Sequence, residues 1–117
     1  VTSHHYSAAH DSAENRAYVE AFRAVAPGVR PNFMSVGGRD GMHLIAEMLA
    51  RTGGSDDGER LVAAGKGLSW TSPRGPMTID ANSRDVVQDI YIRRAERRDG
   101  QIWNIEFDKV AQVRDEG

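Results

Sequence analysis

The chain has 117 residues, with 17 acidic and 15 basic side chains, a formal net charge of −2 and no cysteine. This length fits one domain or one piece of a larger protein. A content of 39% hydrophobic and 27% charged residues is typical of a folded chain rather than a disordered tail. The charge balance excludes a general attraction to nucleic acid or to an anionic membrane. The lack of cysteine excludes a disulfide framework and a thiolate nucleophile.

Both ends of the sequence suggest a fragment. The chain begins at Val1 rather than at methionine, and no charged-then-apolar signal segment follows. Residues 1–3 resemble the tail of a strand, and residues 112–117 are polar. We therefore expect one partial domain over residues 1–117, with no linker long enough to divide it.

The first predicted helix follows a capping signal. Asp11 and Glu14 form a start that resembles a capping box, apolar residues recur at helical spacing, and Pro27-Gly28 ends the helix. Residues 31–36 are apolar and bounded by turn residues, so they predict a short strand or an extended crossing segment.

Two further helices are predicted before the middle of the chain. Asp40 is the expected cap of the second, and the glycine pair at residues 53–54 ends it. Ser55 or Asp56 is expected to begin the third, with Leu61 facing inward.

The second half of the chain predicts β-structure. Residues 77–80 favour a short strand after several helix-breaking glycines and prolines. Residues 86–98 are rich in β-formers, Asp99-Gly100 is a strong two-residue hairpin turn, and residues 101–110 form the return strand.

The hairpin turn also predicts a register. With two turn residues, Ile92 faces Phe107 across the ladder and Arg93 faces Glu106. Alternation then places Trp103, Ile105 and Phe107 on one face, which must pack on something.

Histidines near the start of the chain raise the question of a metal site. His4, His5, His10 and Asp11 carry the imidazole and carboxylate groups that suit zinc or nickel. Their spacing matches no established helical pair such as i, i+4. Solvated loop histidines are therefore the favoured interpretation, and we expect no metal and no cofactor.

The basic run at residues 93–98 resembles a nucleic-acid patch when it is considered alone. On a strand these side chains alternate between faces, and Glu96 lies among them. A charged hairpin that resists aggregation is the favoured interpretation, so we expect no nucleic-acid partner. No nucleophile pattern and no paired carboxylates stand out, and the sequence predicts no enzyme.

Several short motifs follow one another in order over nearly the whole chain. They are YSAAHDSAEN at residues 6–15, YVEAF at 18–22, GRDGMHLI at 38–45, SPRGPMTID at 72–80, RDVVQDIYI at 84–92 and DGQIWNIEF at 99–107. Together they resemble the C-terminal third of type I periplasmic binding proteins, the substrate-binding proteins of branched-chain amino-acid type ABC importers.

This resemblance implies an α/β fold: a fragment of the two-lobe type I periplasmic-binding fold, with three helices followed by a C-terminal β-hairpin. Complete members have two α/β lobes joined by crossover strands, with a ligand cleft between them. Most ligand-contacting residues would lie outside this chain.

The resemblance also implies four candidate ligand-binding residues. Tyr6 lies at a crossing segment, and Phe33 or Met34 matches a family position that can line the cleft. The commoner role of such residues is core or hinge packing. Arg39 replaces an aromatic residue that is frequent in the family, and a cation there could meet a carboxylate ligand.

The implied function is that of an extracytoplasmic, periplasmic solute-binding component of an ABC importer. It would capture a small ligand (an amino acid, an amide or an aromatic carboxylate) by closing its cleft, and deliver it to the membrane permease. The alternative is a ligand-sensing extracytoplasmic domain of a receptor or regulator with the same fold. A third interpretation, a small enzyme with a carboxylate-binding cleft, lacks a catalytic constellation.

An isolated fragment would expose a sheet edge and the apolar hairpin face, and both favour self-association. We therefore expect a dimer, which an exchange of terminal hairpins could form.

Overall fold

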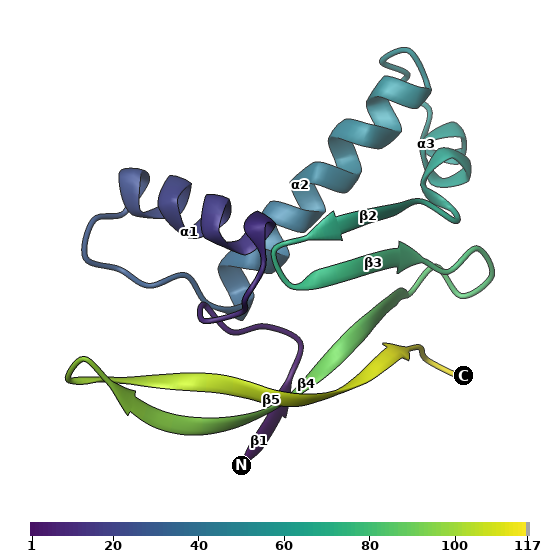
Figure 1. Ribbon diagram of the computed structural model, residues 1–117. Coiled ribbons are helices and arrows are strands. Elements are labelled where there is room, and N and C mark those ends of the chain that lie inside the picture. The colour runs from purple at the N-terminus through teal and green to yellow at the C-terminus, as the bar shows by residue number, and fades with distance from the viewer. Residues whose placement is uncertain (117) are drawn as a thin grey trace.

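The computed structural model describes residues 1–116, which form three helices and five strands (Figure 1). The helices are α1 (Ala13–Val25), α2 (Phe33–Arg51) and α3 (Gly58–Gly65). The strands are β1 (Thr2–His4), β2 (Ser69–Ser72), β3 (Gly75–Ile79), β4 (Val86–Arg98) and β5 (Gln101–Val113).

Helix α1 begins one residue later than the sequence suggests. The hydroxyl of Ser12 accepts a hydrogen bond from the backbone N–H of Asn15 at 3.0 Å, which makes Ser12 the cap. Asp11 instead pairs with Arg16 at 2.7 Å, so the predicted capping role of Asp11 is wrong. The end of the helix is confirmed, because Gly28 adopts a φ of 79° just beyond it.

Helix α2 covers a segment for which a strand was predicted. The side chain of Asn32 accepts from the backbone N–H groups of Met34 and Ser35, and the Ser35 hydroxyl accepts from the Asn32 N–H at 2.9 Å. This reciprocal capping box starts the helix at Phe33. The predicted strand or crossing over residues 31–36 is therefore wrong.

Asp40 is not the cap of α2 but lies inside it and is only 3% exposed. Three glycines of the same helix (residues 37, 38 and 41) lower its intrinsic helix propensity. For this reason the sequence pattern did not predict the first two turns of α2 as helix. The predicted end is confirmed by the positive φ values of Gly53 and Gly54. Helix α3 is capped by Asp57, later than predicted.

All strand pairings in the sheet are antiparallel, in the order β1-β4-β3-β2, with β5 pairing along β4. Strand β2 was not predicted, and β3 begins at Gly75, two residues before the expected start. The long β4 is confirmed with its predicted bounds, whereas β5 continues to Val113. Strand β4 therefore links the hairpin β2–β3 to β1 and to β5.

The β4–β5 ribbon contains a bulge. Arg93 faces Glu106, as predicted, but Ile92 faces Asp108 because the register shifts between residues 92 and 93. The extra residue is Phe107, which is 52% exposed. The predicted pair of Ile92 with Phe107 is therefore wrong.

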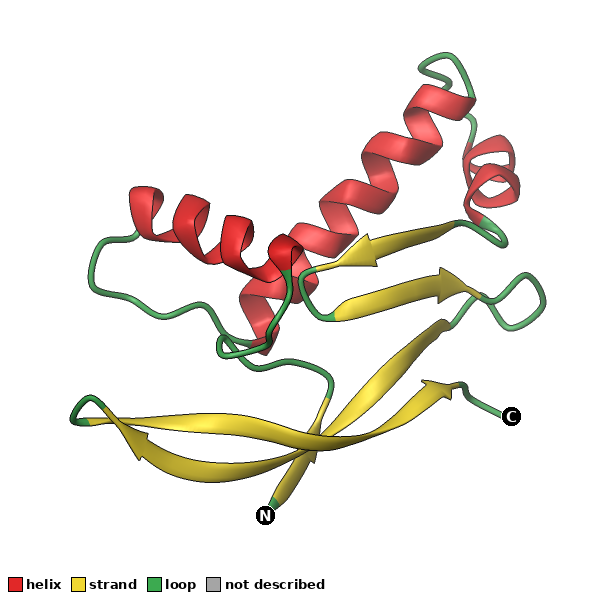
Figure 2. Ribbon diagram, in the orientation of Figure 1, coloured by secondary structure: helices red, strands yellow, loops and turns green. Residues whose placement is uncertain are grey.

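Figures 1 and 2 show α1 and α2 on the same side of the sheet, with α2 along the β2–β3 hairpin and α3 beside its far end. The β4–β5 ribbon passes below both helices. The buried hydrophobic residues are Tyr6, Val36, Leu68, Met77, Ile79, Val87 and Tyr91. The expected α/β class, with three helices and a C-terminal hairpin, is confirmed. Within residues 1–116, no helix combines the length and apolar character that crossing a membrane requires.

Candidate functional site

A cavity of about 430 Å³ lies between the segment after β1, the start of α2 and the β4–β5 ribbon. Its lining residues are His4, Tyr6, Ser7, Ala8, Arg30, Pro31, Asn32, Phe33, Arg93, Trp103 and Asn104. Ligand pockets commonly measure roughly 300–1,000 Å³, so this cavity is large enough for a small solute. We call it the α2 cavity.

A second hollow, of about 680 Å³, lies between α1 and the tip of the ribbon. Its lining includes Asp11 and Arg16, which pair with each other at 2.7 Å and are both largely exposed. None of the four predicted ligand-binding residues lines it.

Tyr6 contributes a wall of the α2 cavity. Its side chain is 2% exposed, and its hydroxyl donates to Asn15 Oδ1 at 2.9 Å. Burial raises the pKa of Tyr6. Tyr6 is therefore a fixed, neutral ring whose polar end is already used within the protein.

Three rings gather where β1 meets the start of α2. The ring centroids of His4 and Phe33 are 4.8 Å apart, and those of His4 and His5 are 4.4 Å apart. We call these residues the aromatic cluster. Phe33 is 45% exposed, so a ligand can reach the cluster from solvent. The capping box at Asn32 places Phe33 there by starting α2 at that point.

Burial is the main influence on the imidazoles of the aromatic cluster, and two nearby arginines act in the same direction. Burial, and then the positive charge of Arg74, lower the pKa of His5 to about 4. Burial and the charge of Arg93 also lower the pKa of His4. His5 is therefore neutral at pH 7.

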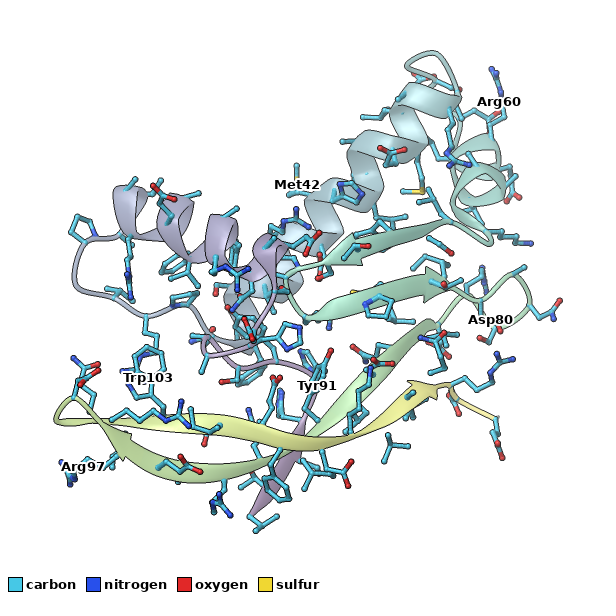
Figure 3. All side chains as sticks on the ribbon, in the orientation of Figure 1. Met42, Arg60, Asp80, Tyr91, Arg97 and Trp103 are labelled. Carbon is cyan, nitrogen blue, oxygen red and sulfur yellow. The ribbon has the colours of Figure 1, made fainter. Side chains whose placement is uncertain are left out.

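Two arginines line the α2 cavity, and they differ in exposure: Arg93 is buried and Arg30 is exposed. Arg93 is 9% exposed and donates through one terminal nitrogen to the Tyr6 carbonyl at 2.7 Å. Arg30 is exposed, lies 3.6 Å above the Trp103 ring and donates to the Ile102 carbonyl. Figure 3 shows Trp103 rising from the ribbon towards the loop that joins α1 and α2.

Two predicted residues do not line the α2 cavity. Met34 is 69% exposed in the first turn of α2, beside Phe33 in sequence. Arg39 is partly exposed and donates to Asp40 at 3.1 Å. The structure thus brings Tyr6 and Phe33 together and leaves Met34 and Arg39 on the surface of α2.

The histidine-rich start does not assemble as one group. His4 and His5 join the aromatic cluster, whereas His10 pairs with Glu106 at 2.6 Å. In residues 1–116, no three His, Cys, Asp or Glu side chains are placed to hold a metal ion.

The comparisons with known proteins agree with the fold. The profile of the family described as "Periplasmic binding protein" matches residues 1–101. The chain is 44% identical to "Leu/Ile/Val-binding protein homolog 6" of Brucella abortus (strain 2308) over 119 aligned residues, which are 100% of this chain and 30% of that protein.

Solved structures give the same result. A solute-binding protein of an ABC transporter from Rhodopseudomonas palustris BisB5, in complex with 3,4-dihydroxybenzoic acid, is 54% identical, with a TM-score of 0.94 over 97% of this chain and 31% of that chain. A second, from Rhodopseudomonas palustris HaA2 in complex with p-hydroxybenzoic acid, is 34% identical, with a TM-score of 0.88 over 95% of this chain and 30% of that chain. The chain therefore spans about 30% of the length of these relatives, and it belongs to the periplasmic binding protein family.

Proposed function

We propose that this chain is part of an extracytoplasmic solute-binding component of an ABC importer, which captures a small aromatic carboxylate and delivers it to the permease. The observation that carries this proposal is the 54% identity and TM-score of 0.94 to a solute-binding protein of an ABC transporter. Binding, rather than chemistry on the solute, is the role of the site.

The composition of the site favours aromatic acids over branched aliphatic amino acids. The aromatic cluster offers ring surfaces, and neutral His5 adds no charge of its own. Arginines near the cluster complement a carboxylate. Two relatives are described as complexes with hydroxybenzoic acids, whereas the Brucella relative carries a Leu/Ile/Val-binding name.

We assign the four predicted residues to the solute as follows. Phe33 and Met34 present apolar surface at the start of α2. Tyr6 supplies a rigid wall of the α2 cavity, and Arg39 supplies a cation farther along the helix. The solute binds across the cleft and shifts the protein towards its closed form by its additional affinity for that form.

Calorimetry on the complete protein tests the ligand class. We expect 3,4-dihydroxybenzoate and 4-hydroxybenzoate to bind, and leucine to bind at least tenfold more weakly. Binding of leucine with no detectable binding of either aromatic acid would contradict the proposal.

Variants of α2 test the assigned residues. Phe33→Ala should weaken the binding of 4-hydroxybenzoate about tenfold, because one ring contact contributes about 1.4 kcal/mol. Met34→Ala should weaken it less. Met42→Ala is the matched control, since Met42 lies on the same helix and is 64% exposed, close to the 69% of Met34. Figure 3 shows Met42 on the side of α2 away from the β2 strand. Equal losses in all three variants would contradict the assignment.

A further inference from the structure

Helix α2 is packed on one side and open on the opposite side. The packed side carries the buried Val36 and Asp40, and Asp40 accepts a hydrogen bond from Ser72 at the end of β2. The opposite side carries residues without a polar side chain, spaced so that a helix places them in one row. These residues are Gly38, Gly41, Met42, Ile45 and Leu49, which we call the α2 stripe.

The α2 stripe is open to solvent in this structure. Met42 is 64%, Ile45 is 45% and Leu49 is 38% exposed. Nothing lies within 4 Å of the position that a Cβ would take at Gly38 or at Gly41. Single exposed apolar side chains are ordinary, but several that adjoin on one helix face form a patch that folded proteins usually cover.

The balance of buried and exposed apolar side chains also differs from that of a complete domain. Among residues 1–116, seven hydrophobic residues are buried, whereas thirteen large hydrophobic residues are exposed. A helix that meets the core on one side and carries apolar residues on the other is typical of a protein interior. Helix α2 therefore has the composition of a middle layer, with one of its two neighbouring layers outside these residues.

The comparisons indicate which partner is available to cover the α2 stripe. The Rhodopseudomonas palustris BisB5 protein contains the same fold with a TM-score of 0.94, but the matched region is only 31% of its chain. The chain likewise spans 30% of the Brucella relative. The larger part of a complete protein of this kind lies outside the matched region and is joined to it covalently. A tethered element meets the stripe at a high effective concentration, whereas a second copy must first lose its translational freedom.

We propose that the α2 stripe is the surface on which another apolar element of the same polypeptide packs, so that α2 lies between the β2–β3 hairpin and that element. Met42, Ile45 and Leu49 supply the apolar area that the contact buries. The two glycines of the stripe let the backbone of the incoming element approach α2 closely, because the distance between packed elements depends on the side chains at the contact.

Cysteine labelling of the complete protein tests this contact. Ile45→Cys places a thiol in the α2 stripe. Glu47→Cys is the matched control, because Ile45 is 45% exposed, the Glu47 side chain is 42% exposed, and Glu47 lies on the same helix outside the stripe. Reaction with a maleimide is followed by mass spectrometry of the peptide that contains each new cysteine. Each rate is divided by the rate of the same variant unfolded in urea.

The contact predicts a difference between these two relative rates. Ile45→Cys should react at least about tenfold more slowly than Glu47→Cys, because its thiol is reached only when the packed element opens. Glu47→Cys should react at a rate close to that of its unfolded form, since a charged position of this exposure stays in water.

The natural methionines give a second measurement that needs no substitution, in case Ile45→Cys fails to fold. Met42 is 64% exposed in this structure, whereas Met77 is 2% exposed. Dilute hydrogen peroxide oxidises accessible methionine side chains to the sulfoxide. In the complete protein, Met42 should be oxidised as slowly as Met77, within about threefold.

Three results would overturn the proposal. Equal relative rates for Ile45→Cys and Glu47→Cys would show that the α2 stripe is open in the complete protein. Oxidation of Met42 at the rate of the unfolded protein would show the same. Protection of Ile45→Cys that increases with protein concentration would assign the stripe to a second copy. Each result leaves the proposed function standing, because calorimetry on the complete protein measures solute binding separately.

Discussion

Asp40 joins helix α2 to the β2–β3 hairpin. Its carboxylate is 3% exposed and accepts hydrogen bonds from Ser72 Oγ at 2.7 Å and from Arg74 Nε at 2.8 Å. We expect Asp40→Ala to lower the free energy of unfolding by about 3–5 kcal/mol, because it leaves the buried Arg74 guanidinium without its counter-charge. Urea denaturation followed by circular dichroism measures this loss.

The matched control for Asp40 is another acid of the same helix. Glu47 pairs with Arg51 at 3.9 Å, and both side chains are well exposed. Glu47→Ala should therefore cost no more than about 0.5 kcal/mol. Similar losses in the two variants would show that the Asp40 contacts contribute little.

His5 predicts a pH dependence of stability. The unfolded chain protonates this imidazole near pH 6.5, whereas the folded chain resists protonation until about pH 4. The contribution of His5 to the free energy of unfolding is therefore fully present above pH 6.5, and it is lost as the pH is lowered from 6.5 towards 4. His5→Gln should reduce the difference in unfolding free energy between pH 7 and pH 5 by roughly 1 kcal/mol, allowing for partial exposure.

Urea midpoints at pH 7 and pH 5 test this difference. Ser3→Gln, at an exposed and non-titrating position of β1, is the control and should leave it unchanged. An equal pH dependence in His5→Gln and in the unchanged chain would rule out a role of His5.

Helix α2 depends on its capping box. Asn32→Ala removes the acceptor for two backbone N–H groups and should cost about 1 kcal/mol. Asn32→Ser restores an acceptor and should recover most of that stability. If Asn32→Ala and Asn32→Ser lose the same free energy in urea denaturation, the start of the helix is set by packing rather than by the cap.

The ends of helices and strands were predictable where one or two neighbouring residues determine the turn. Gly53-Gly54 and Asp99-Gly100 supply positive φ at the chain positions where a helix ends and a hairpin turns. The start of α2 was not predicted, because its glycines weaken helical periodicity and its packing against the hairpin compensates. The bulge at Phe107 was also missed, since residue spacing alone carries no sign of one extra residue in a ladder.

The candidate site was predictable only in part. Tyr6 and Phe33 came from the family resemblance, and both line the α2 cavity. The contribution of Arg93 could not be found by sequence reasoning, because its burial depends on strand β1 pairing with β4 across the length of the chain. His4 ends strand β1 and Tyr6 lies beyond it, so strand alternation gave no signal that would bring His4 to Tyr6.

At the scale of the whole molecule, the 117-residue chain exposes two apolar surfaces. One is a stripe along α2 that includes Met42, which is 64% exposed, and Ile45. The other is on β5, where Phe107 is 52% and Val110 is 55% exposed. Apolar surfaces and a long edge strand favour self-association, and a dimer through the terminal hairpin stays our prediction for the isolated chain.

Light scattering across the micromolar range tests this dimer. Phe107→Lys should convert the chain to a monomer if the β4–β5 hairpin forms the contact, whereas Met42→Lys should leave the mass unchanged. Because each variant adds one positive charge to an exposed apolar position, net charge cannot account for a difference between them. The opposite result would locate the contact on α2, and a monomeric mass of the unchanged chain at every concentration would disprove the dimer.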